Sequence, residues 1–259
     1  MRRLLWLPVL VAVAAGGAAA VSVPAGAAAG DPYGYVVDHA ALDDPDVIAR
    51  GRSLFATACS TCHGTRGEGL VGPDIRASGA AGAHFWITSG RMPAADVDGL
   101  TMRKDPAFPP RDIEALVAYV ATLGDGPAIP RIDPDLGAVP EGGELFRSNC
   151  AACHQAAGAG GALSYGRNAP TLAPASPVQV FEAIRLGPGQ MPAFEEGQLS
   201  EEDVHSIIRY VDYLQDADNP GGFSLGRIGP IPEGFVAIGV GLGLACLAAF
   251  LIGRRAVAA

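Results

Sequence analysis

The middle of this chain is a sequence repeat, and the repeat restricts the fold more than any other feature. The segment GRSLFATACSTCHG (51–64) returns 91 residues later as GGELFRSNCAACHQ (142–155), with Gly, Leu, Phe, both Cys and His in register. GRMPA (90–94) returns as GQMPA (189–193), and DIEALVAYVATL (112–123) returns as DVHSIIRYVDYL (203–214). We therefore expect two copies of one small module, a number that 259 residues can accommodate.

The repeat also predicts where the modules begin and end. We place the first module at residues 45–124 and the second at 141–218. Residues 125–140 between them are rich in Gly and Pro, which is typical of a linker.

Each module is expected to be mainly α-helical. Apolar residues recur at helical spacing in 46–59, 141–150 and 112–123. In the second copy Ser200 is the predicted N-cap of a helix, and the acidic residues at 201–203 suit the positive end of the helix dipole. No strand signal is found, so the predicted fold class is mainly α, with two tandem domains.

The chemistry of each module is predicted from a C-x-x-C-H motif. One motif consists of Cys59, Cys62 and His63, and the other consists of Cys150, Cys153 and His154. This spacing is typical of c-type haem attachment, because two thiols on one helical turn can reach the two vinyl groups of a porphyrin. The adjacent His then supplies a ligand to the iron, so we expect two covalently bound c haems.

Two other uses of the cysteines fit less well. A redox dithiol would be expected beside a βαβ pattern, which the sequence lacks. A zinc site would need four suitable ligands together, and each module offers fewer.

A methionine after each motif is the predicted second iron ligand. Met92 and Met191 occupy equivalent repeat positions, each is followed by Pro, and the chain holds only four Met. Met102 and His84 are rivals in the first module, but neither has a counterpart in the second. We interpret His84 as a surface residue on a helix.

A proline in each module is predicted to orient the haem histidine. The carbonyls of Pro73 and Pro170 would accept the second ring N–H of His63 and His154, respectively. His/Met ligation fills both axial positions and raises the reduction potential, which favours electron transfer over substrate chemistry. We therefore expect an electron carrier with no substrate-converting site of its own.

Charge and composition exclude two classes of protein. The net charge of −9 excludes a nucleic-acid-binding protein that relies on a basic face. With 49% hydrophobic and 17% charged residues, the chain is also no acidic disordered protein. The Gly-rich runs 64–72 and 158–166 are interpreted as loops around the haem edge.

Both ends have the composition of membrane segments. Residues 1–30 carry two Arg, an apolar run and then small residues, which predicts a secretory signal or a retained anchor. Residues 234–253 contain no charge and are long enough to span a bilayer as a helix, and Arg254 and Arg255 follow directly. The positive-inside rule then puts the C-terminus in the cytoplasm and both modules outside the cell membrane.

The modules and the whole layout resemble a known family. Each module resembles a short class I cytochrome c. The whole chain resembles the dihaem cytochrome c subunit of the actinobacterial-type cytochrome bcc (menaquinol–cytochrome c reductase) complex. The matching segments are GRSLF…CSTCHG (51–64), GRMPA (90–94), GGELFRSNCAACH (142–154), GPGQMPAF (187–194) and GRIGPIPEGF (226–235).

This resemblance implies the partners. A cytochrome b subunit and a Rieske iron–sulfur subunit would belong to the same complex. One haem would take electrons from the Rieske protein, and the other would pass them to a haem–copper cytochrome c oxidase. The chain would then be the electron-transfer subunit of a quinol–cytochrome c reductase.

Two other functions remain open from the sequence. The chain could be the cytochrome subunit of a periplasmic dehydrogenase, because its modules would look alike. A dihaem peroxidase would need one haem with an openable site, and the matched Met92 and Met191 argue against it.

Overall fold

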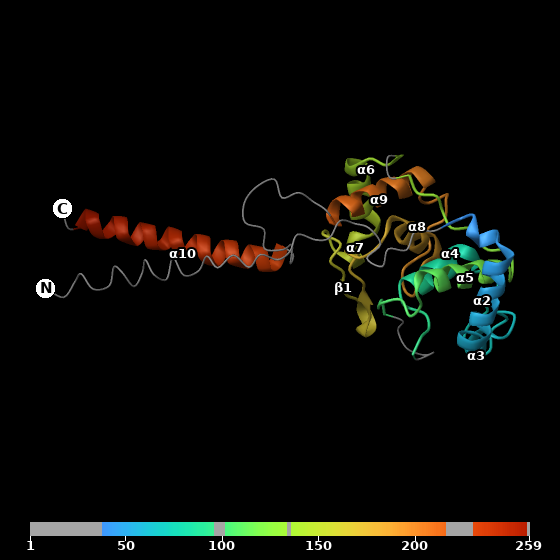
Figure 1. The fold of residues 1–259 in the computed structure, drawn as a ribbon. Helices are drawn as coiled ribbons and strands as arrows, with labels where there is room; N and C mark the ends of the chain where they lie inside the picture. The colour runs from blue at the N-terminus through green and yellow to red at the C-terminus, as the bar shows by residue number, and fades with distance from the viewer. Residues whose placement is uncertain (1–37, 96–101, 134–135, 216–229, 258–259) are drawn as a thin grey trace.

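The computed structural model describes residues 38–95, 102–133, 136–215 and 230–257 (Figure 1). The predicted N-terminal membrane segment, 1–30, lies outside these ranges. The described chain is mainly helical, as the sequence predicts. Two helical modules lie beside each other, and a single long helix extends away from them (Figure 1).

Both modules are built from helices of one to four turns. The first contains η1 (Ala41–Asp43), α2 (Pro45–Ala58), α3 (Ser60–His63), α4 (Gly79–Thr88) and α5 (Pro110–Ala121). The second contains α6 (Val139–Asn149), α7 (Ala151–His154), β1 (Gly161–Ala162), η3 (Ser164–Gly166), β2 (Asn168–Ala169), α8 (Pro177–Leu186) and α9 (Glu201–Gln215).

The second module contains one short strand pair that gave no signal in the sequence. The two-residue strands β1 and β2 pair antiparallel, with Gly161 opposite Ala169. They lie in or next to the Gly-rich run 158–166, and they are too short to show the alternation that identifies a strand in a sequence.

In each module the first long helix crosses the last one at a glycine. A Cβ on Gly51 would lie 1.8 Å from the carbonyl oxygen of Ala115, and a Cβ on Gly142 would lie 1.8 Å from that of Ser206. The missing side chain therefore lets α2 pack directly on α5, and α6 on α9. The two crossings involve repeat-equivalent residues, so the modules share one framework.

An aromatic pair fills the space beside each crossing. The rings of Phe55 and Tyr119 lie 5.2 Å apart between centroids, and those of Phe146 and Tyr210 lie 5.4 Å apart. Both phenylalanines are 1% exposed and belong to the core of their module. These tilted pairs anchor the helices from which the haem motifs project.

The helices α4 and α8 bring the two modules into contact (Figure 1). The interpretation of His84 as a surface residue is wrong, because its side chain is buried in this contact. His84 Nδ1 lies 2.8 Å from both carboxylate oxygens of Glu182, and the two residues are 3% and 1% exposed. A helix that meets a second module on its outer face buries residues that a single module would expose.

Part of the predicted linker packs against the modules. Ile129 is 4% exposed and belongs to the first hydrophobic core. The carbonyl of Pro127 accepts a hydrogen bond from the amide of Ala81 in α4. At the other end of the segment, the amide of Ala138 donates to the hydroxyl of Ser206 in α9. The segment therefore contacts both modules.

The helix α10 (Pro230–Val257) contains the predicted membrane segment. Its stretch Gly234–Arg254 is long and apolar enough to cross a membrane, and none of it is buried in the fold. Glycines 239, 241 and 243 have no neighbouring atoms within 4 Å of an added Cβ. The apolar, uncovered surface suits contact with lipid or with another membrane helix.

Candidate haem-binding sites

Each C-x-x-C-H motif lies on a sharp turn between two helices. Cys59 ends α2, and the four-residue helix α3 follows with Cys62 and His63. In the second module Cys150 ends α6, and α7 presents the remaining Cys and His. The short second helix holds the two thiols and the imidazole of each motif on one compact turn.

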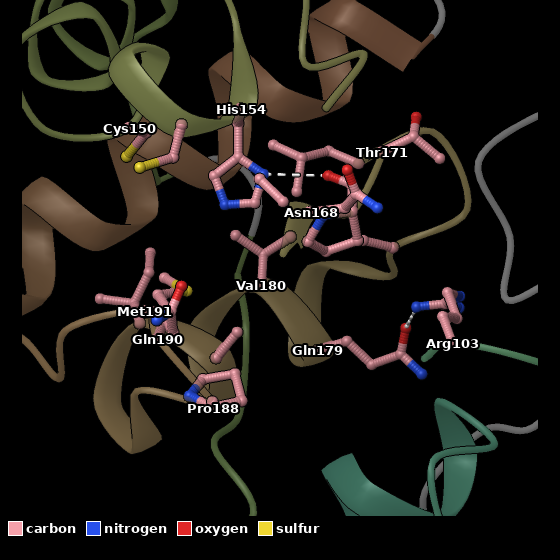
Figure 2. Close-up of a pocket in the computed structure, with 18 of the residues that line it drawn as sticks. Arg103, Cys150, His154, Asn168, Thr171, Gln179, Val180, Pro188, Gln190 and Met191 are labelled. Atoms are coloured by element: carbon pink, nitrogen blue, oxygen red, sulfur yellow. Dashed lines mark hydrogen bonds between the residues drawn. The ribbon is translucent and has the colours of Figure 1, made fainter. Parts of the chain in front are cut away.

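Each motif histidine is oriented by a proline carbonyl. His63 Nδ1 lies 2.8 Å from the carbonyl oxygen of Pro73, and His154 Nδ1 lies 3.0 Å from that of Pro170 (dashed in Figure 2). A carbonyl can only accept, so Nδ1 carries the proton in both rings. The lone pair of Nε2 is then available to a metal, as in ligating histidines with a fixed tautomer.

The electrostatics of the motif favour neutral groups. Burial, and then the neighbouring thiol, raises the pKa of Cys59 and of Cys150 to about 11. Burial lowers the pKa of His154, while its hydrogen bond to Pro170 acts in the opposite direction. Zinc binds thiolates, so cysteines whose thiols stay protonated are poorly suited to a zinc site. The described residues contain no group of three or more His, Cys, Asp or Glu side chains that could hold a metal ion.

One cavity in the second module brings together all four predicted haem residues. Cys150, Cys153, His154 and Met191 line it. Figure 2 shows His154 at the top of the view, and Met191 lower and to the left. The walls are mainly apolar, as a haem ring requires, and include Phe146, Leu163, Leu172, Ala183, Ile184, Ile207 and Val211. The donor set and the apolar walls fit a c haem.

In the first module the first motif cysteine and the predicted methionine share one hydrophobic cluster. Cys59 and Met92 both pack against the first core, as Cys150 and Met191 pack against the second. Met92 follows α4 in the loop that begins at Gly90, whose φ of +65° is accessible to glycine. The two modules thus place cysteine and methionine on their cores in the same way.

The rival ligands have other surroundings. His84 hydrogen-bonds Glu182 at the module contact, as described above. Met102 lines the cavity of the second module and is 51% exposed. His205 is buried in α9, and its Nδ1 donates to the carbonyl of Glu201.

The first module also lines the cavity of the second, which the sequence analysis missed. Its contributing residues are Phe85, Trp86, Arg91, Met102 and Arg103. The Arg103 guanidinium donates to Gln179 Oε1 at 2.9 Å (Figure 2) and to the carbonyl of Pro174 at 2.7 Å. Burial, with repulsion from Arg103, lowers the pKa of Arg91 to about 10. Arg91 therefore stays charged at neutral pH.

A sequence signal for Arg91 does exist. Its repeat-equivalent is Gln190, so GRMPA and GQMPA differ in charge at this one position. A difference between two copies of a module points to a role that arises only where the copies meet.

Comparison with protein families identifies both modules. Residues 48–124 match the family model described as cytochrome c. Residues 137–211 match the model described as cytochrome c oxidase, cbb3-type, subunit III. The chain therefore contains two cytochrome c domains, which imply covalently bound haem c.

Similar curated proteins extend the match to nearly the whole chain. The cytochrome bc1 complex cytochrome c subunit of Mycobacterium tuberculosis (strain ATCC 25618 / H37Rv) is 39% identical over 98% of this chain and 92% of its own length. The subunit of the same name in Mycobacterium leprae is 40% identical over 93% and 84%. The one in Corynebacterium efficiens is 37% identical over 82% and 78%. The chain thus belongs to the family of cytochrome c subunits of the cytochrome bc1 complex.

Proposed function

We propose that this chain holds two c haems and relays electrons through them, from a Rieske iron–sulfur subunit to a haem–copper cytochrome c oxidase. The observation that carries the proposal is the duplicated site. Each module has its C-x-x-C-H turn, its proline-held histidine and a methionine on the same core.

Each residue of the site has a defined task. Cys59 and Cys62, and likewise Cys150 and Cys153, would attach the porphyrins. The axial pairs would be His63 with Met92 and His154 with Met191. The haem itself supplies a one-electron couple. With an iron ligand from each histidine and each methionine and with apolar residues around the ring, the site would favour outer-sphere electron transfer.

The rest of the proposal concerns partners and sidedness. The relatives are named as subunits of the cytochrome bc1 complex, so the chain would assemble with a cytochrome b subunit and a Rieske subunit. The α10 stretch Gly234–Arg254 would anchor it in the cell membrane. The cationic end of that stretch would lie in the cytoplasm, with both modules on the other side.

Counting the haems tests the first part of the proposal. Full-length protein purified in detergent should contain two c haems per chain by pyridine haemochrome. The double variant C59A/C62A should retain one, and so should C150A/C153A. A wild-type count of one would contradict the two-haem assignment.

Replacing each methionine tests the axial ligands. M92A and M191A should each remove about half of the long-wavelength charge-transfer band of oxidised His/Met haem, and M102A should remove none. If the band survives in full in M191A, Met191 is not the ligand.

Co-purification tests the partners. A mild-detergent pull-down of the tagged chain should carry b-type and a-type haem bands along with the c-type band. If a dehydrogenase subunit travels with the c-type band alone, the chain serves a periplasmic dehydrogenase instead.

A further inference from the structure

Arg91 is a half-buried cation whose polar atoms are incompletely satisfied. Its Nη1 atom is buried and has no hydrogen-bond partner among the described residues. The guanidinium carbon lies 5.1 Å from the ring centroid of Phe85, and both residues line the cavity of the second module. Arg50, Arg76 and Arg111 each lie within 4 Å of a carboxylate oxygen.

A partly unpaired guanidinium of this kind is stabilised by a nearby anion. Removing a guanidinium from water without pairing its N–H donors is unfavourable, and buried charges are normally paired. A guanidinium fits a carboxylate best, because two parallel N–H groups can reach both oxygens. A haem bears two propionate carboxylates, and neither the cysteines nor the axial residues account for them.

We propose that Arg91 of the first module binds a propionate carboxylate of the haem held by the second module. This inference rests on the proposed function, in that it requires a haem at Cys150 and Cys153. Arg103 and Arg167 line the same cavity and add positive charge, and the N–H groups of Arg103 hold Gln179 and the carbonyl of Pro174.

The position of Arg91 in the chain links the two sites. It directly precedes Met92, the proposed iron ligand of the first haem, and it reaches the cavity of the second. One loop would therefore contact both haems. The repeat-equivalent Gln190 is uncharged, so the first haem receives no matching charge from that position.

This asymmetry has a consequence for electron distribution. A fixed positive charge beside the second haem stabilises its reduced form, because reduction adds a negative charge. Arg91 would thus raise the potential of the second haem relative to the first and bias the electron toward it. Arg91 would affect the reduction potential through its positive charge, and it would not ligate the iron.

The test replaces Arg91 with the residue found in the other copy. The experiment uses the full chain with the substitutions R91Q, R91K and R111Q. R111Q is the control, because the side chain of Arg111 is 79% exposed. Both haems are titrated by spectroelectrochemistry, and the second haem is identified as the one altered in M191A. Redox-difference infrared spectra are recorded with haem labelled by ¹³C at the propionate carboxyls.

R91Q is expected to reduce about ten-fold the equilibrium preference of the electron for the second haem, which is about 59 mV for a one-electron couple. R91K should restore most of that preference, and R111Q should not change it. The labelled carboxylate band should shift in R91Q and, more weakly, in R91K, because an ammonium cannot make the two-pronged contact.

Three results would overturn the inference. These are an unchanged carboxylate band in R91Q, a potential shift confined to the first haem, or an equal shift in R111Q. If R91Q does not fold, the labelled carboxylate band of R91K is compared with that of the wild type, and an unchanged band contradicts the inference. Failure of the proposed function would show separately, as a wild-type haem count below two.

Discussion

At the scale of single residues, Gly142 controls how closely α6 lies against α9. A Cβ at this position would lie 1.8 Å from a backbone oxygen, and a backbone atom cannot move aside as a flexible side chain can. Gly142→Ala should therefore push the helices apart and lower the free energy of unfolding by about 3 kcal/mol, the upper part of the range for overpacking. Thermal unfolding of the haem-loaded chain, followed by circular dichroism, measures this.

Gly197→Ala is the matched control, because an added Cβ there meets nothing within 4 Å. Its free energy of unfolding should lie within about 0.5 kcal/mol of the wild-type value, as is usual for surface substitutions. Equal stability of the two variants would show that α6 and α9 can separate at no cost.

The repeat register allowed residue positions to be predicted where both copies use them. It paired Met92 with Met191, and it paired the two glycines at the helix crossings. It could not predict the role of Arg91 or the His84–Glu182 contact, because each acts between modules and the aligned residue of the other copy differs, as Gln190 does from Arg91. Those contacts depend on how two surfaces dock, which periodicity does not encode.

At the scale of elements, the start of α9 is fixed by a reciprocal cap, as the sequence predicts. The hydroxyl of Ser200 accepts from the amide of Asp203 at 3.1 Å, and Asp203 Oδ2 accepts from the amide of Ser200 at 2.8 Å. Ser200→Ala removes the side-chain acceptor and should cost about 1 kcal/mol.

The comparison is with Ser148→Ala, where the exposed hydroxyl donates back to the carbonyl of Glu144 within α6. That substitution should be neutral, since alanine is the better helix former. Urea unfolding of both variants gives the difference. A loss at Ser148 as large as that at Ser200 would remove the cap as the explanation.

Helices that face solvent on one side were predictable, and fully enclosed elements were not. The pattern in 112–123 predicts α5 to within two residues at each end. In α4, nine of ten residues are buried, so no polar face marks it as a helix. The strands β1 and β2 hold two residues each, too few for any period.

At the scale of the whole molecule, the buried His84–Glu182 pair joins the modules into one unit. Further contacts support it, since Gln179 of α8 donates to the hydroxyl of Thr88 in α4 at 2.9 Å. A fixed contact keeps the two haem sites at one separation and lets the first module complete the cavity of the second. The sequence predicted the modules but could not predict this contact, because docking buries a glutamate that would face water in an isolated module.

The stability of the docked molecule should therefore depend on pH through Glu182. Burial raises the pKa of this carboxyl from 4.5 to about 7, although its hydrogen bond to His84 acts in the opposite direction. Between these values the folded chain keeps a proton that the unfolded chain has released. The free energy of unfolding must then fall as the pH rises from about 4.5 to about 7, by at most about 1.4 kcal/mol per pH unit.

Glu182→Gln removes this titration and retains a side chain that can hydrogen-bond His84. Relative to wild type, E182Q should therefore become more stable as the pH rises from 5 to 7. The difference in unfolding free energy should level off by pH 8. Urea unfolding at each pH measures it, and titrating groups that do not touch Glu182 cancel in the difference. A difference that stays constant, or that moves in favour of the wild type as the pH rises, would mean that Glu182 is already ionised in the docked molecule.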